Sequence, residues 1–318
     1  MFAQTLHNQQ LLWQADYPAP TLQPHEVLIK VAYAGVNRAD LYQLQGKYPA
    51  PEGASPLLGL EVSGEIVALG AEVAGWKTGD LVCALLEGGG YAEYVAVAAT
   101  QLLPVPKGWS MAQAGALPET LFTNWLALVE TADLKAGETL LIHGGASGIG
   151  SFAIGLAKQL GAKVIVTVGT AKKAAFCLAR GADQAINYRE QDFAALESVD
   201  VVLDTIGGDY MQKNLKLLKR GGRLVQLAFL QGAKAELNMA TLLFNNLRWQ
   251  GVTLRSQSRE MKANLTRQIL ASCTKWLESG ALNVPIHAQF PLQEAQKAHA
   301  MMEQNLNSGK IVLKVATL

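Results

Sequence analysis

A glycine-rich segment near the middle of the chain has the residue types and spacing of a phosphate-binding loop. It follows an apolar run, Thr139–His143, that predicts a β-strand, and the apolar residues after it recur at helical spacing. Glycine permits a tight turn and a close approach to a pyrophosphate, and a helix N-terminus offers free N–H donors. The pattern predicts dinucleotide binding, with a plain structural turn as the alternative. The loop residues are Gly145, Ala146, Ser147, Gly148, Ile149 and Gly150.

The end of the next predicted strand indicates which dinucleotide binds. NAD-binding proteins usually carry Asp or Glu about 20 residues after the loop, where it accepts a hydrogen bond from the ribose 2′-hydroxyl. The strand predicted at 163–168 is instead followed by Gly169, Thr170 and Lys173, with no carboxylate among residues 169–173. A hydroxyl and an ammonium suit a 2′-phosphate, so NADPH is predicted rather than NADH. The alternative is that Lys172 and Lys173 are solvated residues in the first turn of a helix.

Composition excludes several classes of protein. Lys and Arg total 27 against 26 Asp and Glu, and only 17% of residues are charged, which argues against a nucleic-acid binder and a disordered acidic chain. The three cysteines, Cys83, Cys177 and Cys273, are too few and too scattered for a disulfide framework or a cysteine-rich zinc site. No signal peptide and no apolar stretch of about 18 residues is visible, so we expect a soluble cytoplasmic protein without a membrane partner.

The predicted elements change in character along the chain. Short β-type runs separated by Gly and Pro fill the first third and predict a small barrel-like β domain. From residue 139 strands and helices alternate, with further strands at 200–204 and 222–228, which is typical of a parallel sheet covered by helices on both faces. After residue 255 this alternation ends, and we expect the chain to return to the first domain.

Eight segments spread over the chain match one family in order and spacing. They are Asn37–Tyr42, Gly46–Pro49, Leu58–Gly64, Gly88–Tyr94, Ala116–Thr120, Leu141–Gly150, Pro291–Ala295 and Gly309–Leu313. These segments resemble the medium-chain dehydrogenase/reductase superfamily. Within it they resemble the zinc-independent quinone oxidoreductases, in particular the p53-inducible-protein-like NAD(P)H:quinone oxidoreductases.

The resemblance implies an α/β fold of two domains. A GroES-like β domain would comprise residues 1–119 and 256–318, and a Rossmann domain with a doubly wound parallel sheet would be inserted at 120–255. The active site would lie in the cleft between them. The resemblance also implies a homodimer formed through edge strands of the Rossmann sheets. Residues 247–254 would be such an edge, although their apolar content suits a buried strand equally.

Two positions depart from the alcohol dehydrogenases of this superfamily. Where those enzymes place a zinc-binding Cys and a His–Glu pair, this chain has Asn37 and Leu60–Glu61. Leucine cannot bind zinc, asparagine binds it poorly and the five histidines are scattered, so we predict no metal site. Without a Lewis acid, the chemistry suits a small acceptor that takes a hydride readily, such as a quinone or an activated carbonyl compound.

The resemblance also implies roles for single side chains. Asn37, Tyr42 and Tyr48 would line the cleft, where Asn37 can donate to a carbonyl and Tyr48 can stabilise negative charge or assist protonation. Alternatively, Tyr42 is core packing and Tyr48 a turn aromatic. Tyr188 would contact the 2′-phosphate side of the adenosine. Asn124 would reach toward the cleft, although helix-surface polarity explains it nearly as well.

Two residues near the end of the chain carry weaker expectations. Lys310, before the last predicted strand, can approach a phosphate. His299 and Glu303 are four residues apart on a predicted helix and are expected to form a surface pair.

Three functions are compatible with the sequence. The first is NADPH-dependent reduction of quinones, and the second, in the same fold, is reduction of 2-alkenals or enoyl thioesters. The third is non-catalytic NADPH binding, against which the intact Asn37, Tyr48 and phosphate loop argue. No basic cluster for the phosphates of an acyl carrier is evident, which favours small acceptors.

Overall fold

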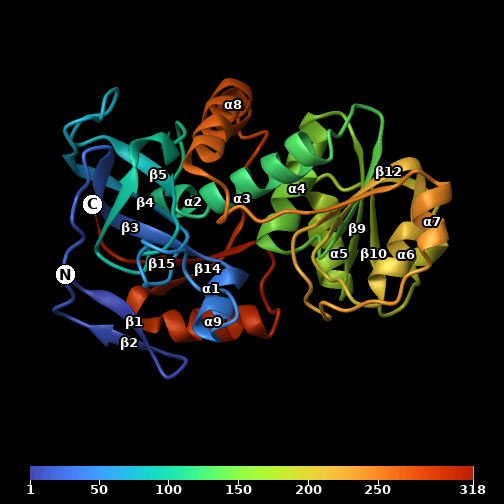
Figure 1. Ribbon diagram of the computed structural model, residues 1–318, viewed down its shortest axis with the longest axis horizontal. Helices are drawn as coiled ribbons and strands as arrows, with labels where there is room; N and C mark the ends of the chain where they lie inside the picture. The colour runs from blue at the N-terminus through green and yellow to red at the C-terminus, as the bar shows by residue number, and fades with distance from the viewer. Residues whose placement is uncertain (318) are drawn as a thin grey trace. The chain divides into compact units, whose positions relative to one another are not determined.

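The computed structural model describes residues 1–317, and the chain divides into two units (Figure 1). Unit 1 contains Met1–Phe122 and the chain from Arg255 onward, whereas unit 2 contains Thr123–Leu254. The divisions expected from the sequence, after residues 119 and 255, lie close to these positions. The chain leaves unit 1 within α3 (Pro118–Asn124), which continues as a π-helical segment, Trp125–Thr131.

Unit 1 is built on a mixed sheet that combines strands from both ends of the chain. The strands of this sheet are β3 (Glu26–Val36), β4 (Glu61–Leu69), β5 (Leu81–Leu85), β6 (Tyr94–Ala98), β7 (Leu102–Pro104), β14 (Ile286–Pro291) and β15 (Lys310–Lys314). A separate two-stranded sheet of unit 1 is formed by β1 (Ala3–His7) and β2 (Gln10–Gln14). The helices of unit 1 are α1 (Arg38–Leu44), α2 (Met111–Ala114), α8 (Arg259–Glu278) and α9 (Ala295–Glu303). The mixed sheet runs β14-β15-β3-β4-β5-β7, with β6 paired to β3.

The core of unit 1 follows from the alternation of apolar residues along β3. Val27, Ile29 and Val31 point inward and are fully buried, as are Ile311 and Leu313 of the neighbouring β15. β15 pairs with β3 in antiparallel register, so the C-terminal strand is an interior member of the sheet. The return of the chain to the first domain is therefore a structural requirement of this sheet.

Unit 2 contains the predicted doubly wound sheet. Its strands are β8 (Thr139–His143), β9 (Lys163–Val168), β10 (Gln184–Asn187), β11 (Val199–Asp204), β12 (Leu218–Gln226) and β13 (Arg248–Gly251). Its helices are α4 (Gly148–Gln159), α5 (Ala171–Ala179), α6 (Tyr210–Leu217) and α7 (Met239–Phe244). All pairs are parallel in the order β10-β9-β8-β11-β12-β13. This is the Rossmann order, which reverses direction beside β8, where such sheets bind nucleotides.

Some elements lie outside what the sequence predicted. The β1–β2 hairpin, β10 and α6 were not expected. The strands β2 and β10 are short, and half or more of their residues are not buried, so they lack a clear apolar pattern. β12 begins at Leu218, before the predicted start at 222. Its pairing with β11 changes register between Val199 and Val201. Among residues 1–317, no helix has both the length and the apolar character needed to cross a bilayer.

Candidate active site

In unit 2, the predicted phosphate loop joins β8 to α4 and is crowded at two glycines. A Cβ atom on Gly145 would lie 2.5 Å from Cβ of Val166 on β9, and one on Gly150 would lie 2.5 Å from the Gly144 carbonyl oxygen. Larger residues would therefore force the helix away from the sheet. Ala146, between them, is buried.

The start of α4 leaves backbone donors for an anion. Ser147 caps the helix, and its Oγ accepts the Gly150 N–H at 3.0 Å. The N–H groups of Gly148 and Ile149, in the first turn, have no acceptor within the helix. Asn124 is fully buried and donates from Nδ2 to the Ile149 carbonyl oxygen at 3.1 Å. This hydrogen bond stabilises the first turn of α4.

A second group of predicted residues lies where β9 meets α5. Thr170 caps α5 and its Oγ1 accepts the Lys173 N–H at 3.2 Å, which leaves the hydroxyl hydrogen available to a ligand. Tyr188 is 44% exposed. A Cβ atom on Gly169 would lie 2.5 Å from the Tyr188 hydroxyl, so only glycine allows the phenol to rest over this turn. The structure thus brings Gly169, Thr170, Lys173 and Tyr188 to one edge of the sheet.

The first turn of α4 has the donors that a dinucleotide needs. The first turn of α4 presents N–H groups to a pyrophosphate, and its partial positive charge favours an anion. Thr170 and Lys173 stand at the start of α5, the position where an NAD-binding protein would carry a carboxylate.

In unit 1, the three predicted acceptor-binding residues belong to α1 and the loop after it. Asn37 is the N-cap of α1, Tyr42 lies within the helix and Tyr48 follows its C-terminal end. Asn37 is 9% exposed, and both tyrosines are half-buried. The Asn37 N–H donates to Asp40 Oδ2 at 2.8 Å, which fixes the start of the helix.

Asn37 lies in a buried cluster with an ion pair. Lys310 Nζ is 2.6 Å from Asn37 Oδ1 and 2.6 Å from Glu61 Oε1, and Asn37 Nδ2 donates to Glu61 Oε1 at 2.9 Å. The side chains of Lys310 and Glu61 are 3% and 0% exposed. The expectation that Lys310 approaches a phosphate is therefore wrong, because its ammonium is buried against protein acceptors.

A second buried network lies beside this cluster. Tyr91 donates from its hydroxyl to Asp40 Oδ2 at 3.2 Å, and the same hydroxyl lies 3.0 Å from His299 Nε2. Burial raises the pKa of Asp40 to about 6, and burial lowers the pKa of His299 to about 4.

His299 is thus a core residue, and the expected surface pair with Glu303 is wrong. The signal was present in the sequence, since Ala295, Ala298 and Met302 mark the buried stripe of α9 and residue 299 falls on it.

Tyr48 has a cationic neighbour that sequence analysis missed. The guanidinium carbon of Arg255 lies 5.4 Å from the centre of the Tyr48 ring, within cation–π range. Arg255 is held by its Nε, which donates to the Glu87 carbonyl oxygen at 2.9 Å. Burial and the charge of Glu119 raise the pKa of Tyr48, and Arg255 opposes this shift. Tyr48 is therefore a neutral phenol at physiological pH and can donate a hydrogen bond.

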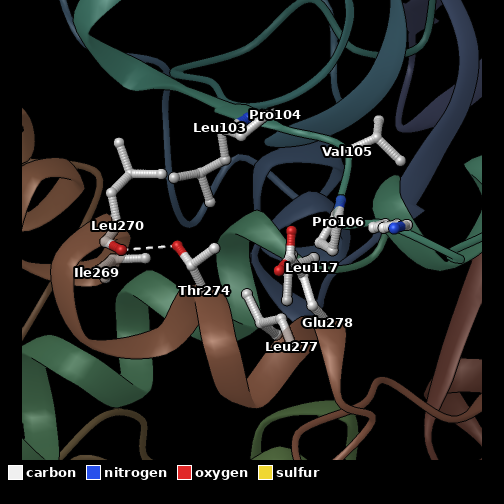
Figure 2. Close-up of a pocket in the computed structure, with 11 residues that line it drawn as sticks. Leu103, Pro104, Val105, Pro106, Leu117, Ile269, Leu270, Thr274, Leu277 and Glu278 are labelled. Carbon is white, nitrogen blue, oxygen red and sulfur yellow. Dashed lines mark hydrogen bonds between the residues drawn. The ribbon is translucent and has the colours of Figure 1, made fainter.

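An apolar pocket of unit 1 lies elsewhere. Figure 2 shows it between α8 and the segment around β7. The pocket has a volume of about 140 Å³. It is lined by Leu103, Pro104, Val105, Pro106, Lys107, Leu117, Ile269, Leu270, Thr274, Leu277 and Glu278. None of the predicted site residues lines this pocket, so it does not coincide with the candidate active site.

Comparison with known proteins places the chain in a family. Residues 23–107 match the alcohol dehydrogenase GroES-like domain, and residues 180–313 match the zinc-binding dehydrogenase family. The quinone oxidoreductase of Lama guanicoe is 31% identical over 311 residues, covering 94% of this chain and 92% of that protein. The chain belongs to the quinone oxidoreductase family of medium-chain dehydrogenases/reductases.

Solved structures of the family agree with this assignment. The Escherichia coli quinone oxidoreductase complexed with NADPH is 29% identical, with a TM-score of 0.87 over 99% of each chain. The CurK enoyl reductase is 27% identical, with a TM-score of 0.86 over 99% of each chain. The predicted family, the GroES-like domain and the Rossmann domain are thus confirmed. The protein is an oxidoreductase with an NAD(P)-binding fold.

The description of the matched family implies a zinc ion. The residues of the Asn37 cluster do not fit one. An ammonium already lies between the two oxygens that could bind a cation, and an ammonium and Zn²⁺ repel each other. Zinc sites in proteins use Cys, His and carboxylate ligands. Within residues 1–317, no group of three or more His, Cys, Asp or Glu side chains is arranged to hold a metal.

Proposed function

We propose that the protein is an NADPH-dependent, metal-independent reductase that delivers hydride to small quinones. The observation that carries the proposal is the donor set in unit 1. An amide, Asn37, replaces the zinc-binding Cys of alcohol dehydrogenases, and Lys310 fills the position between Asn37 and Glu61. The loop after the same helix carries Tyr48, a neutral phenol. Hydrogen bonds suffice for an acceptor that takes hydride without a Lewis acid. The names of the similar proteins support quinones as that acceptor.

Each unit would contribute its own groups. The first turn of α4 would bind the pyrophosphate, and Thr170, Lys173 and Tyr188 would bind the 2′-phosphate. Bound NADPH supplies the hydride. Asn37 and Tyr48 would donate hydrogen bonds to the acceptor oxygen as negative charge develops on it. Tyr42, half-buried on the helix that Asn37 caps, would line the acceptor site.

Reduction of activated alkenes is the second candidate. It is favoured by the similarity to the CurK enoyl reductase, which shares the fold over nearly the whole chain. The same donors would then stabilise an enolate oxygen formed when hydride adds to the β-carbon of an enoyl thioester or a 2-alkenal.

We also propose a homodimer formed through β13. This strand ends the Rossmann sheet, pairs only with β12 among residues 1–317, and is exposed along its length. Trp249 on β13 is 46% exposed, and Leu243 and Phe244 of the preceding α7 are about 70% exposed. An unpaired edge with exposed large apolar side chains is a pairing surface for another strand.

A steady-state panel tests the function. Purified protein with NADPH or NADH is offered ortho-quinones, para-quinones, 2-alkenals and a crotonyl thioester. We expect turnover of quinones with NADPH. Turnover of alkenals or the thioester without quinones would establish the second candidate, and tight NADPH binding without any turnover would identify a non-catalytic binding protein.

A further inference from the structure

The ammonium of Lys310 has no hydrogen-bonding capacity left for a ligand. Its Nζ donates to the Val36 carbonyl oxygen at 3.0 Å, to Asn37 Oδ1 at 2.6 Å and to Glu61 Oε1 at 2.6 Å. A lysine has three N–H donors, so these contacts use all of them. Any effect of Lys310 on chemistry must therefore act through its partners.

The charges of Lys310 and Glu61 fix which way the Asn37 amide faces. Oδ1 meets the ammonium, and Nδ2 donates to the carboxylate at 2.9 Å. The flipped amide would place its NH₂ against the ammonium and its oxygen against the carboxylate, and both contacts would be repulsive. Asn37 is therefore held with one N–H of Nδ2 engaged, and within residues 1–317 the second N–H is uncommitted.

The surrounding backbone is shaped to hold this arrangement. Gly35 lies next to the carboxylate, and any Cβ atom there would overlap Glu61 Oε1. The other carboxylate oxygen, Oε2, accepts the Glu119 N–H at 2.9 Å. The opposite charges of Lys310 and Glu61 offset each other, as a buried pair requires.

We infer that Lys310 is a positioning residue that makes Asn37 an oriented and strengthened hydrogen-bond donor for the acceptor oxygen. A cation at the amide oxygen withdraws electron density from the nitrogen, so the uncommitted N–H becomes a better donor. The benefit grows as negative charge develops on the oxygen that receives this hydrogen bond. The inference rests on the proposed function, in which Asn37 contacts the acceptor.

The first test removes both charges so that no buried charge is left unpaired. The variant Lys310→Met/Glu61→Gln is compared with Arg223→Met/Glu138→Gln, which removes a pair joined at 2.6 Å in unit 2. We expect kcat to fall by about tenfold or more in the first variant only, with the dissociation constant for NADPH unchanged. The loss should be larger for a weakly electrophilic quinone than for a strongly electrophilic one. Equal kcat values in the two variants would overturn the inference.

A double-mutant cycle separates positioning from a general structural role. Asn37→Ala is introduced alone and into Lys310→Met/Glu61→Gln. If Lys310 acts through Asn37, the combined variant is no slower than Asn37→Ala alone. Additive losses would show that Lys310 acts by another route. Should the Met variant not fold, Lys310→Gln/Glu61→Gln retains hydrogen-bonding groups without the charges.

A spectroscopic measurement keeps this inference distinct from the proposed function. The side-chain NH₂ protons of Asn37 are observed by ¹⁵N NMR in the wild type and in the charge-free variant. We expect the uncommitted N–H proton to move upfield when the charges are removed, whether or not quinones are the acceptor. An unchanged proton shift would refute the positioning role, whereas absent quinone turnover in the wild type would refute only the proposed function.

Discussion

At single residues, burial decides which groups near the candidate acceptor site carry charge. Asp40 and His299 both contact the Tyr91 hydroxyl, yet burial moves their pKa values in opposite senses, to about 6 and about 4. Each shift favours the uncharged form. This part of unit 1 can therefore remain uncharged near pH 5, while Lys310 and Glu61 form a charged pair beside it.

These two shifts predict opposite pH dependence of stability. Folded Asp40 keeps its proton up to about pH 6, whereas the ordinary pKa of an aspartate is 3.8. Its contribution to the free energy of unfolding therefore declines as the pH rises from 3.8 through 6. Folded His299 stays neutral down to about pH 4, whereas the ordinary pKa of a histidine is 6.5. Its contribution to the free energy of unfolding therefore declines as the pH falls from 6.5 toward 4. The two partly cancel in the wild type. One pKa unit corresponds to about 1.4 kcal/mol of unfolding free energy.

Two variants separate these contributions. In His299→Gln the melting temperature should fall as pH rises from 4 to 6, the interval over which the pKa of Asp40 is shifted. In Asp40→Asn it should rise between pH 4 and 6.5, the interval set by His299. Thermal denaturation followed by circular dichroism measures both. Parallel pH profiles in the two variants would contradict the assignment.

Tyr48 provides a prediction about rate. Replacing Tyr48 by Phe removes the hydroxyl and keeps the ring over which Arg255 lies. Because the raised pKa keeps this hydroxyl protonated, its loss should lower kcat by about tenfold to hundredfold through the neutral pH range. Tyr94→Phe, a half-buried tyrosine on β6, is the matched control. An unchanged kcat in Tyr48→Phe would return this residue to a packing role.

At the scale of elements, the start of α5 governs cofactor choice. Lys173 stands in the first turn, after the Thr170 cap, and Lys172 precedes it with an exposed side chain. Lys173→Ala should weaken NADPH binding by about tenfold or more and leave NADH binding unchanged, because only NADPH carries the 2′-phosphate. Lys172→Ala is the control on the same helix. Fluorescence titration with both cofactors measures the ratio, and equal weakening by the two variants would contradict a specific contact.

Local elements were predictable because their signals are contiguous in the chain. β8, the phosphate loop and α4 occupy Thr139–Gln159, and strand, turn and helix signals follow each other there. The Glu61–Lys310 contact joins residues 249 positions apart, so no local pattern could indicate it. The same holds for Arg255, which reaches Tyr48 only through tertiary folding. The type of site therefore stays a prediction from the sequence, whereas the electrostatics of the site could be described only from the structure.

At the scale of the whole molecule, the exposed edge of unit 2 predicts the oligomeric state. Trp249→Glu/Phe244→Glu places charges on β13 and α7 and should convert a dimer into a monomer, because charged side chains oppose pairing at a sheet edge. Leu81→Glu, at a residue 48% exposed on β5, is the control. Light scattering during size-exclusion chromatography gives the mass. A dimer that survives the double substitution would exclude this edge as the interface.

The interior position of β15 also sets an order of events during synthesis. Unit 2 is one uninterrupted stretch, Thr123–Leu254, and can fold while the ribosome is still translating. The edge of β3 stays without its partner until residues 310–314 emerge. At ribosomal speeds of about 5–20 residues per second, that wait lasts roughly 15–55 seconds. Throughout it the nascent chain carries an open strand edge, so a chaperone that shields such edges should raise the yield of folded protein more than one acting after release.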